Sequence, residues 1–313
     1  MQSASLGVSL YIDTRFRCSA QRLTRKAKLA IQELTKERVE FATCRVYFEQ
    51  AFRVAYQEYL KKGYCPANPF QMRLSLYNAL PDTVTFCLWR KNILLGTATL
   101  IFDSSLGLPI ESVYPQEIQE LRKAGRKLCE VSLLALNSQV ISKGILPIYF
   151  AERLRCLYQI FKPIFWYARE TARSSDLCIA MNPVHKFLYS SLYFEQFAEE
   201  RVYESVNGNP SLAMRLSFDD IEERSKKRTP GLYKLFLGKR LELKQISEIF
   251  RWSSEDFRYF FVENSDVLRK AKPDQIDYLA SLYPEFSIRQ MTKETNESAS
   301  HHFVSIRSGN KMT

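Results

Sequence analysis

Short apolar runs separated by polar turns divide the middle of the chain into strands, and apolar residues spaced three or four apart mark the helices between them. Residues 48–62 and 147–171 follow the helical spacing, and a shorter helix is predicted over 115–126. A hairpin is predicted where residues 90–92 separate two strand-like segments. The predicted strands are residues 39–45, 83–89, 93–102, 128–136, 176–181, 202–203 and 212–218.

This order of elements predicts an α/β (α+β) fold for residues 38–218, with a mostly antiparallel mixed sheet and helices on both faces. From residue 219 the spacing becomes helical, which predicts a helical extension over 219–286. We expect a basic segment at 1–37 and a polar, disordered tail at 287–313. The helices expected in the extension are residues 242–250, 255–271 and 274–282.

Charge and cysteine content narrow the environment in which this protein works. The formal net charge of +11 favours an acidic partner, although a basic solvated surface is an equally good interpretation. Seven cysteines without a C-x-x-C pair indicate thiols in a reducing compartment. With no secretory signal or long apolar span, the sequence predicts a cytoplasmic protein. Residues 20–37 predict a basic amphipathic helix, either solvated or in peripheral contact with an anionic membrane.

Glu130 stands out because it lies inside the otherwise apolar strand at 128–136. Burial of a carboxylate disfavours its charged form and raises its pKa, which suits a group that exchanges protons at neutral pH. A glutamate on the solvated face of a strand is the alternative, and the pattern taken by itself favours that alternative.

Several ordered motifs carry a family resemblance that the periodicity does not show. They are Gly-Thr-x-x-Leu from Gly96, Leu-Gly-Leu-Pro at 106–109, Glu-Val-Ser at 130–132 and Asn-Pro-Val-His at 182–185. Their order resembles the long-chain N-acyl amino acid synthases, which are GNAT-like acyltransferases related to the acyl-homoserine-lactone autoinducer synthases. The resemblance covers residues 38–218. The chain departs from the usual family pattern at Leu133, where an arginine is common, and at Tyr193, where a glycine is usual.

The resemblance implies a GNAT-like fold and transfer of a medium or long fatty acyl chain to the α-amine of an amino acid. In such a fold the fourth and fifth strands part, so backbone N–H groups near residues 133–135 become candidate oxyanion donors. An apolar tunnel for the acyl chain is expected between Leu134 and Leu136 of the strand and the following helix, with plain core packing as the alternative for most of these side chains. The helix residues expected to line it are Phe150, Leu154, Leu157, Tyr158 and Phe161. The resemblance implies catalytic roles for Glu130 and Ser132 and substrate-binding roles for Tyr56, Tyr59, Asp103, Leu134, Ala135, Asn182, His185 and Tyr189.

The expected acyl donor is an acyl carrier protein with its acyl-phosphopantetheine arm. Residues 137–144 lack the glycine-rich loop with which GNAT enzymes hold the coenzyme A pyrophosphate, and carrier proteins are acidic. We expect no tightly bound cofactor, no nucleic-acid partner and no metal, because His185 is the only histidine before residue 301. The predicted docking patch for the carrier protein is Arg122, Lys123, Arg126, Lys127 and Lys143.

Two other functions stay open at this stage. One is an acyl-homoserine-lactone synthase that uses S-adenosylmethionine, although Leu-Gly-Leu-Pro and Asn-Pro-x-His favour the amino acid synthase. The other is a non-catalytic, basic binding protein on a decayed acyltransferase fold, which Leu133 and the net charge keep open. The chain lacks the serine-hydrolase elbow, the P-loop and the His-Glu-x-x-His zinc motif.

Overall fold

The computed structural model describes residues 37–141, 146–219, 221–228, 233, 237 and 240–294. The chain from Arg38 onward forms one compact unit, distinct from residues 1–37. The basic segment predicted at 1–37, with its amphipathic helix at 20–37, therefore lies outside the described residues apart from Glu37. No helix in the described part of the chain is long and apolar enough to cross a membrane.

An eight-stranded sheet with the order β1-β2-β3-β4-β5-β8-β6 organises the fold, and β7 pairs with β8. Pairing is antiparallel between β2 and β3, β3 and β4, β5 and β8, β6 and β8, and β7 and β8, whereas β4 and β5 are parallel. The predicted mostly antiparallel mixed sheet is thus confirmed. The strands are β1 Glu37–Phe41, β2 Val84–Arg90, β3 Ile93–Phe102, β4 Leu128–Leu136, β5 Asp176–Met181, β6 Glu195–Gln196, β7 Arg201–Tyr203 and β8 Asn209–Ser217.

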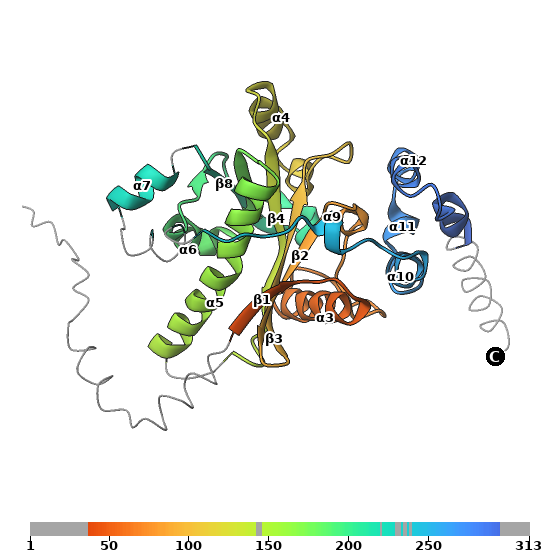
Figure 1. Cartoon of the computed structure of the whole chain (residues 1–313), viewed down its shortest axis with the longest axis horizontal. Coiled ribbons are helices and arrows are strands. Elements are labelled where there is room, and N and C mark those ends of the chain that lie inside the picture. The colour runs from red at the N-terminus through yellow and green to blue at the C-terminus, as the bar shows by residue number, and fades with distance from the viewer. Residues whose placement is uncertain are drawn as a thin grey trace, which may run out of the picture. The chain divides into compact units, whose positions relative to one another are not determined.

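The two faces of the sheet carry different helices because the side chains of a strand alternate between faces. In β2, Phe86 and Leu88 join a core with α5, whereas Cys87 and Trp89 join a second core with α3. Figure 1 shows α5 and α3 on opposite sides of the sheet. The helices of this domain are α3 Arg45–Lys61, α4 Pro115–Lys123, α5 Leu146–Trp166, α6 Lys186–Ser191 and α7 Ile221–Arg228.

The C-terminal helices pack on the α3 face of the sheet rather than forming a separate core. Trp252, Phe257 and Phe260 are buried together with Phe48 and Phe52 of α3. Of the three helices predicted there, the one over 274–282 is confirmed by a helix at Pro273–Leu282. The other two differ from the structure: 241–245 is not helical, and the helix expected over 255–271 is broken into shorter turns. The α-helices of this region are α9 Ile246–Ile249, α10 Ser254–Arg258, α11 Val267–Lys270 and α12 Pro273–Leu282.

The first residues of the tail predicted at 287–313 are helical instead of disordered. Residues 288–294 are helical, and Ile288 and Met291 are buried in the same core as α12. Polar composition hid this short amphipathic segment, because two apolar residues three positions apart are enough to dock one helical turn. Residues 295–313 lie outside the described part of the chain.

Candidate active site

A pocket opens where β4 and β5 part. The parallel pairing of the two strands runs from Leu128 opposite Asp176 to Glu130 opposite Cys178 and stops there. Beyond that point, residues 131–134 of β4 and 179–181 of β5 line the two sides of one pocket. The parted strands were expected from the family resemblance, and they leave an edge of β4 backbone facing a cavity rather than a neighbouring strand.

A β-bulge at Leu133 shapes this free half of β4. In the pairing with β3, Thr99 lies opposite Ser132 and Thr97 opposite Ala135, so β4 has two residues where β3 has one. Leu133 has a left-handed backbone with φ of 50°, which is unusual for leucine. The bulge re-aims the backbone beside the pocket, where an N–H group without a strand partner can donate a hydrogen bond to a ligand.

The same bulge reverses the alternation of side chains. Val131 packs on the α5 face before the bulge, and Leu134 and Leu136 pack on that face after it. Ala135 consequently joins the α3 core and does not line the pocket. The structure thus places Ala135, a predicted substrate-binding residue, outside the pocket lining, because a regular strand pattern does not anticipate the extra residue.

Glu130 lies at the junction of the paired and free halves of β4. Its side chain is buried, with 3% of the residue exposed, and lines the pocket. One oxygen, Oε2, accepts a hydrogen bond of 2.8 Å from the backbone N–H of Ile110. Burial raises the pKa of Glu130 to about 8, the Ile110 hydrogen bond opposes that rise, and the charge of Glu111 adds to it. Glu130 can therefore exchange a proton near neutral pH.

The Leu-Gly-Leu-Pro motif builds the loop that holds Glu130. Gly107 has φ of 70°, and a Cβ there would lie 2.6 Å from Glu111 Oε1. That same oxygen accepts a hydrogen bond from the backbone N–H of Leu108. The turn leads directly into the short 3-10 helix Pro109–Ser112, which contains the Ile110 donor. The motif thus positions a backbone donor against the buried carboxyl.

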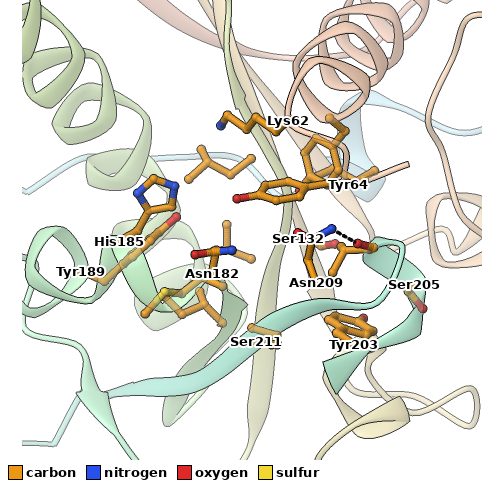
Figure 2. Close-up of a pocket in the computed structure, with 18 of the residues that line it drawn as sticks. Lys62, Tyr64, Ser132, Asn182, His185, Tyr189, Tyr203, Ser205, Asn209 and Ser211 are labelled. Atoms are coloured by element: carbon orange, nitrogen blue, oxygen red, sulfur yellow. Dashed lines mark hydrogen bonds between the residues drawn. The ribbon is translucent and has the colours of Figure 1, made fainter. Parts of the chain in front are cut away.

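The Asn-Pro-Val-His segment lines the opposite side of the pocket. Asn182 follows β5 and caps the next turn, since its Oδ1 accepts a hydrogen bond of 3.1 Å from Val184 N–H. Burial and the positive charges of Lys62 and Arg153 lower the pKa of His185, which is therefore neutral at pH 7 and able to accept a proton. Asn182, His185 and Tyr189 all line the pocket (Figure 2), as do Glu130, Ser132, Tyr59 and Leu134.

Tyr193, where the family resemblance leads us to expect a glycine, adopts the left-handed backbone that glycine favours. It has φ of 68° directly after α6, and its N–H bonds the carbonyl of Ser190. The N–H of Phe194 bonds the carbonyl of Tyr189, which completes a left-handed helix cap of the kind normally closed by glycine.

Several pocket residues carry no role in the sequence-based prediction. Lys62 and Tyr64 follow α3, and Figure 2 shows their side chains and that of His185 around the same open space. Partial burial and the neighbouring Arg153 lower the pKa of Lys62, which marks a crowded positive mouth. The sequence contained a signal for Lys62 and Tyr64, since they end and follow the helix predicted over 48–62, within the residues that carry the family resemblance. The remaining additional lining residues include Arg73, Arg153, Tyr203, Ser205, Asn209 and Ser211.

An apolar end of the pocket lies between α5 and the sheet. Leu134 and Leu136 line it from β4, Leu157 lines it from α5, and Met181 and Leu188 line it from the β5 side. Of the α5 residues expected around the tunnel, Phe161 is instead fully buried in the core, and Tyr158 packs against that core without lining the pocket. Leu154 is absent from the lining, and the side chain of Phe150 lies outside the described residues.

Two predicted substrate-binding residues lie away from the pocket. Tyr56 is buried in the α3 core, where its hydroxyl accepts a hydrogen bond of 3.1 Å from Asn68 N–H. Asp103 ends β3 beside the paired half of β4 and binds Arg122 through two hydrogen bonds of 2.7 Å. Neither residue lines this pocket, because their polar groups anchor neighbouring loops.

The predicted docking patch does not adjoin the pocket. Arg122 binds Asp103 and Glu111, and Arg126 binds Asp176 and Asp219, so both guanidinium groups are held by internal ion pairs. Lys123 and Lys127 are exposed but precede β4, at the end where it is still paired with β5. Lys143 lies outside the described residues. The sequence did not reveal that these basic residues border the closed end of the strand.

Comparison with known proteins adds to this geometry. The family model of the N-acyl amino acid synthase FeeM matches residues 50–217. The structure of FeeM, an N-acyl amino acid synthase from uncultured soil microbes, is 27% identical, covers 60% of this chain and 93% of its own, and has a TM-score of 0.51. The acyl-homoserine-lactone synthase LasI is 12% identical, covers 66% of this chain and 98% of its own, and has a TM-score of 0.47. No curated protein matches the sequence.

The sheet, its parted strands and the FeeM structure define a GNAT-like N-acyltransferase. The matched residues make up more than half of the 313-residue chain, which belongs to the N-acyl amino acid synthase FeeM family. The family and the acyltransferase class inferred from the motifs are therefore confirmed.

Proposed function

We propose that this enzyme transfers a medium or long fatty acyl chain from acyl carrier protein to the α-amine of an amino acid. The observation that carries the proposal is the pocket itself, which joins a buried carboxyl, a free strand edge and an apolar end. Glu130 lies where the free edge of β4 begins, and Leu134, Leu136 and Leu157 line the apolar end. The apolar end can hold the acyl chain, and the free strand edge can bind the thioester carbonyl. The buried carboxyl can accept a proton from the attacking amine.

In the proposed reaction the amine nitrogen attacks the thioester carbonyl carbon, the C–N bond forms and the C–S bond breaks. An amino acid arrives mostly as an ammonium ion, whose positive charge favours the ionised form of Glu130. Glu130, directly or through water, accepts a proton from the nitrogen, and the thiol of the phosphopantetheine arm leaves with a proton. His185, neutral at pH 7, is a second acceptor on the opposite side of the pocket.

The developing oxyanion requires donors that are already in place. The backbone N–H groups of Leu133 and Leu134, at the bulge, and the hydroxyl of Ser132 are the proposed donors. Donors on a packed strand need no rearrangement when charge develops, so each contributes more than a mobile group would. The left-handed Leu133 is part of this arrangement because the bulge sets the direction of the neighbouring backbone.

The mouth of the pocket supports an acidic protein as donor. Lys62 and Arg153 provide positive charge there, and Val184 and Phe187 are 77% and 82% exposed beside His185. Apolar side chains so exposed near a charged rim are typical of interaction surfaces. We propose this mouth, in place of the Arg122–Lys127 patch, as the docking surface for the carrier protein.

The first test is chemical. Purified enzyme is given acyl carrier protein loaded with acyl chains of several lengths, together with a mixture of amino acids, and the products are identified by mass spectrometry. N-acyl amino acids support the proposal. An acyl-homoserine lactone, formed only when S-adenosylmethionine is added, would replace it, and no acyl product under any condition would favour the non-catalytic alternative.

The second test concerns the donor. The ratio of turnover with acyl carrier protein to turnover with acyl-coenzyme A is measured across a salt series in wild type, Arg153→Glu and Phe187→Ser. We expect carrier-protein turnover alone to fall with salt and with both substitutions, because docking between exposed charges is screened. Lys127→Glu, an equal charge reversal at the closed end of β4, is the control that should change neither donor. Equal use of both donors in every variant would contradict the carrier-protein assignment.

A further inference from the structure

The pocket contains a guanidinium group whose bonding is incomplete. Arg73 lines the pocket, and its Nη2 donates one hydrogen bond of 2.8 Å to the carbonyl of Ser205. Its Nε is buried and bonds no described atom, and no described carboxylate forms an ion pair with it. Arginine has five N–H donors, so even with the Ser205 carbonyl and the neighbouring Cys65 thiol as acceptors, most of them have no acceptor among the described residues.

The position of Arg73 is nevertheless fixed. Its guanidinium carbon lies 4.6 Å from the centre of the Tyr59 ring, and its backbone N–H bonds the carbonyl of Phe52 in α3. The Cys65 thiol lies beside it, and Ser205 appears on the Tyr203 side of the pocket in Figure 2. A planar group held by stacking, with unused donors, is arranged to bind a planar anion.

Other arginines of the same chain show what a fully bonded guanidinium looks like. Arg201 also stacks on a tyrosine, with 4.9 Å between its guanidinium carbon and the ring centre of Tyr114. Unlike Arg73, Arg201 pairs with Glu117 and also donates to the carbonyl of Val113. The missing acceptor at Arg73 is therefore not a general consequence of stacking on tyrosine.

The same pocket contains a buried acid without a cation. Glu130 accepts a hydrogen bond from Ile110 but forms no ion pair with a described basic residue, Arg73 included. Both groups act on Tyr59, where Arg73 lowers the pKa and Glu130 raises it, although burial is the largest influence. The pocket thus contains one carboxyl group, Glu130, and one guanidinium group, Arg73, that form no ion pair with each other.

We propose that Arg73 binds the α-carboxylate of the acceptor amino acid while the amine lies toward Glu130. A zwitterion has the complementary charges, whereas a simple amine leaves Arg73 without an acceptor. This inference rests on the proposed function and specifies how its acceptor is recognised.

The test uses two ligands that differ in the carboxylate alone, so that binding is measured without catalysis. N-decanoylglycine carries the acyl chain, the amide and the carboxylate, and N-methyldecanamide is the same molecule without the carboxylate. Their dissociation constants are measured by isothermal titration calorimetry with the full chain. We expect wild type to bind N-decanoylglycine on the order of tenfold to hundredfold more tightly, as a charge-assisted hydrogen-bonded pair predicts.

Three variants make the result specific. Arg73→Gln should remove the preference for N-decanoylglycine and leave the affinity for N-methyldecanamide within about twofold. Arg73→Lys should keep part of the preference, because the charge remains while the planar pair of donors is lost. Arg201→Gln, the matched stacked arginine outside the pocket lining, should behave as wild type. Thermal unfolding of each variant confirms that the chain is folded.

A kinetic split provides the second readout. For the best acceptor amino acid, Arg73→Gln should raise KM on the order of tenfold or more and leave kcat/KM for the decarboxylated amine unchanged. A preference that survives in Arg73→Gln, or is absent in wild type, would overturn the carboxylate assignment while leaving acyl binding intact. Binding of neither ligand by folded wild type would count against the proposed acyl pocket as well.

Discussion

The two halves of β4 belong to one continuous strand but differ in pairing: one half is paired on both edges and the other on one edge only. Residues 128–130 are paired on both sides, and the adjoining Asp176 of β5 is fully buried and bound by Arg126. Residues 131–136 are paired with β3 alone, and their other edge faces the pocket. The closed half therefore fixes the strand, and the open half can present backbone donors without losing its position. Glu130 is the last residue of the closed half, and its side chain lines the pocket beside the open half.

The comparison also separates two kinds of charge. Near the closed half, Arg122 and Arg126 are each bound by two carboxylates. In the pocket beside the open half, Glu130 and Arg73 have no ion-pair partner among the described residues. Paired buried charges hold structure together, whereas unpaired ones are unfavourable unless a ligand or a reaction uses them. The predictions that follow test this division.

The largest effect is expected at the junction of the two halves. Glu130→Gln keeps the size of the side chain but cannot accept a proton from the amine, so kcat should fall roughly 100-fold to 10,000-fold. The fold should be kept, because the buried Glu130 is already largely neutral at pH 7. Steady-state kinetics and thermal unfolding check both parts. A variant with wild-type kcat would remove Glu130 from the reaction and leave His185 as the proton acceptor to test.

A change in the closed half should act on stability instead of catalysis. Arg126→Ala removes the main partner of Asp176, whose side chain is 0% exposed, and leaves Arg215 at 3.4 Å as its remaining cation. We expect the free energy of unfolding to fall by about 3 kcal/mol, the lower end for a broken buried pair.

Urea unfolding measures the effect of Arg126→Ala, with Lys123→Ala as the exposed control on the preceding helix. Lys123→Ala should stay within about 0.5 kcal/mol of wild type. The kinetics of folded Arg126→Ala should match those of wild type. A large loss of kcat/KM without a loss of stability would contradict the division between the two halves.

Sequence reasoning recovered the sheet better than the site, for reasons visible in β4. The limits of β3, β4 and β5 agree with the prediction because buried strands are continuous apolar runs bounded by turns. The motif order also placed Glu130, Ser132, Asn182 and His185 in one pocket, since ordered motifs report on distant parts of a fold.

The misses came from features that no local pattern contains. The bulge at Leu133 reversed the side-chain alternation and sent Ala135 to the opposite face. Asp103 and Arg122 looked available in the sequence, but they bind each other across a loop. Arg73 lies in an irregular segment whose path is set by tertiary packing, so its place in the pocket required the structure.

The pH dependence of stability tests the burial of Glu130 by a separate measurement. The pKa of Glu130 is raised from 4.5 to about 8, so between these values the folded state binds more protons than the unfolded state. Stability attributable to Glu130 is therefore present at low pH and is lost as pH rises through that window, by at most about 1.4 kcal/mol per pH unit. Urea unfolding of wild type and Glu130→Gln from pH 5 to 9 measures it. The stability difference between them should shift in favour of Glu130→Gln as pH rises, and parallel curves would mean that the pKa is not raised.

The smallest effect should appear at the apolar end of the open half. Leu134 lines the pocket on the α5 face, so Leu134→Phe adds bulk where the acyl chain is proposed to lie. Each methylene that no longer fits loses about 0.8 kcal/mol of burial, which is roughly a fourfold loss of kcat/KM. The preferred chain should therefore become one or two methylenes shorter, as competition among acyl donors of different lengths would reveal. Leu121→Phe, on α4 and outside the pocket lining, is the control that should leave the length profile unchanged. If Leu134→Phe instead lowers turnover equally for all lengths, the chain lies elsewhere, and the open half of β4 serves the carbonyl alone.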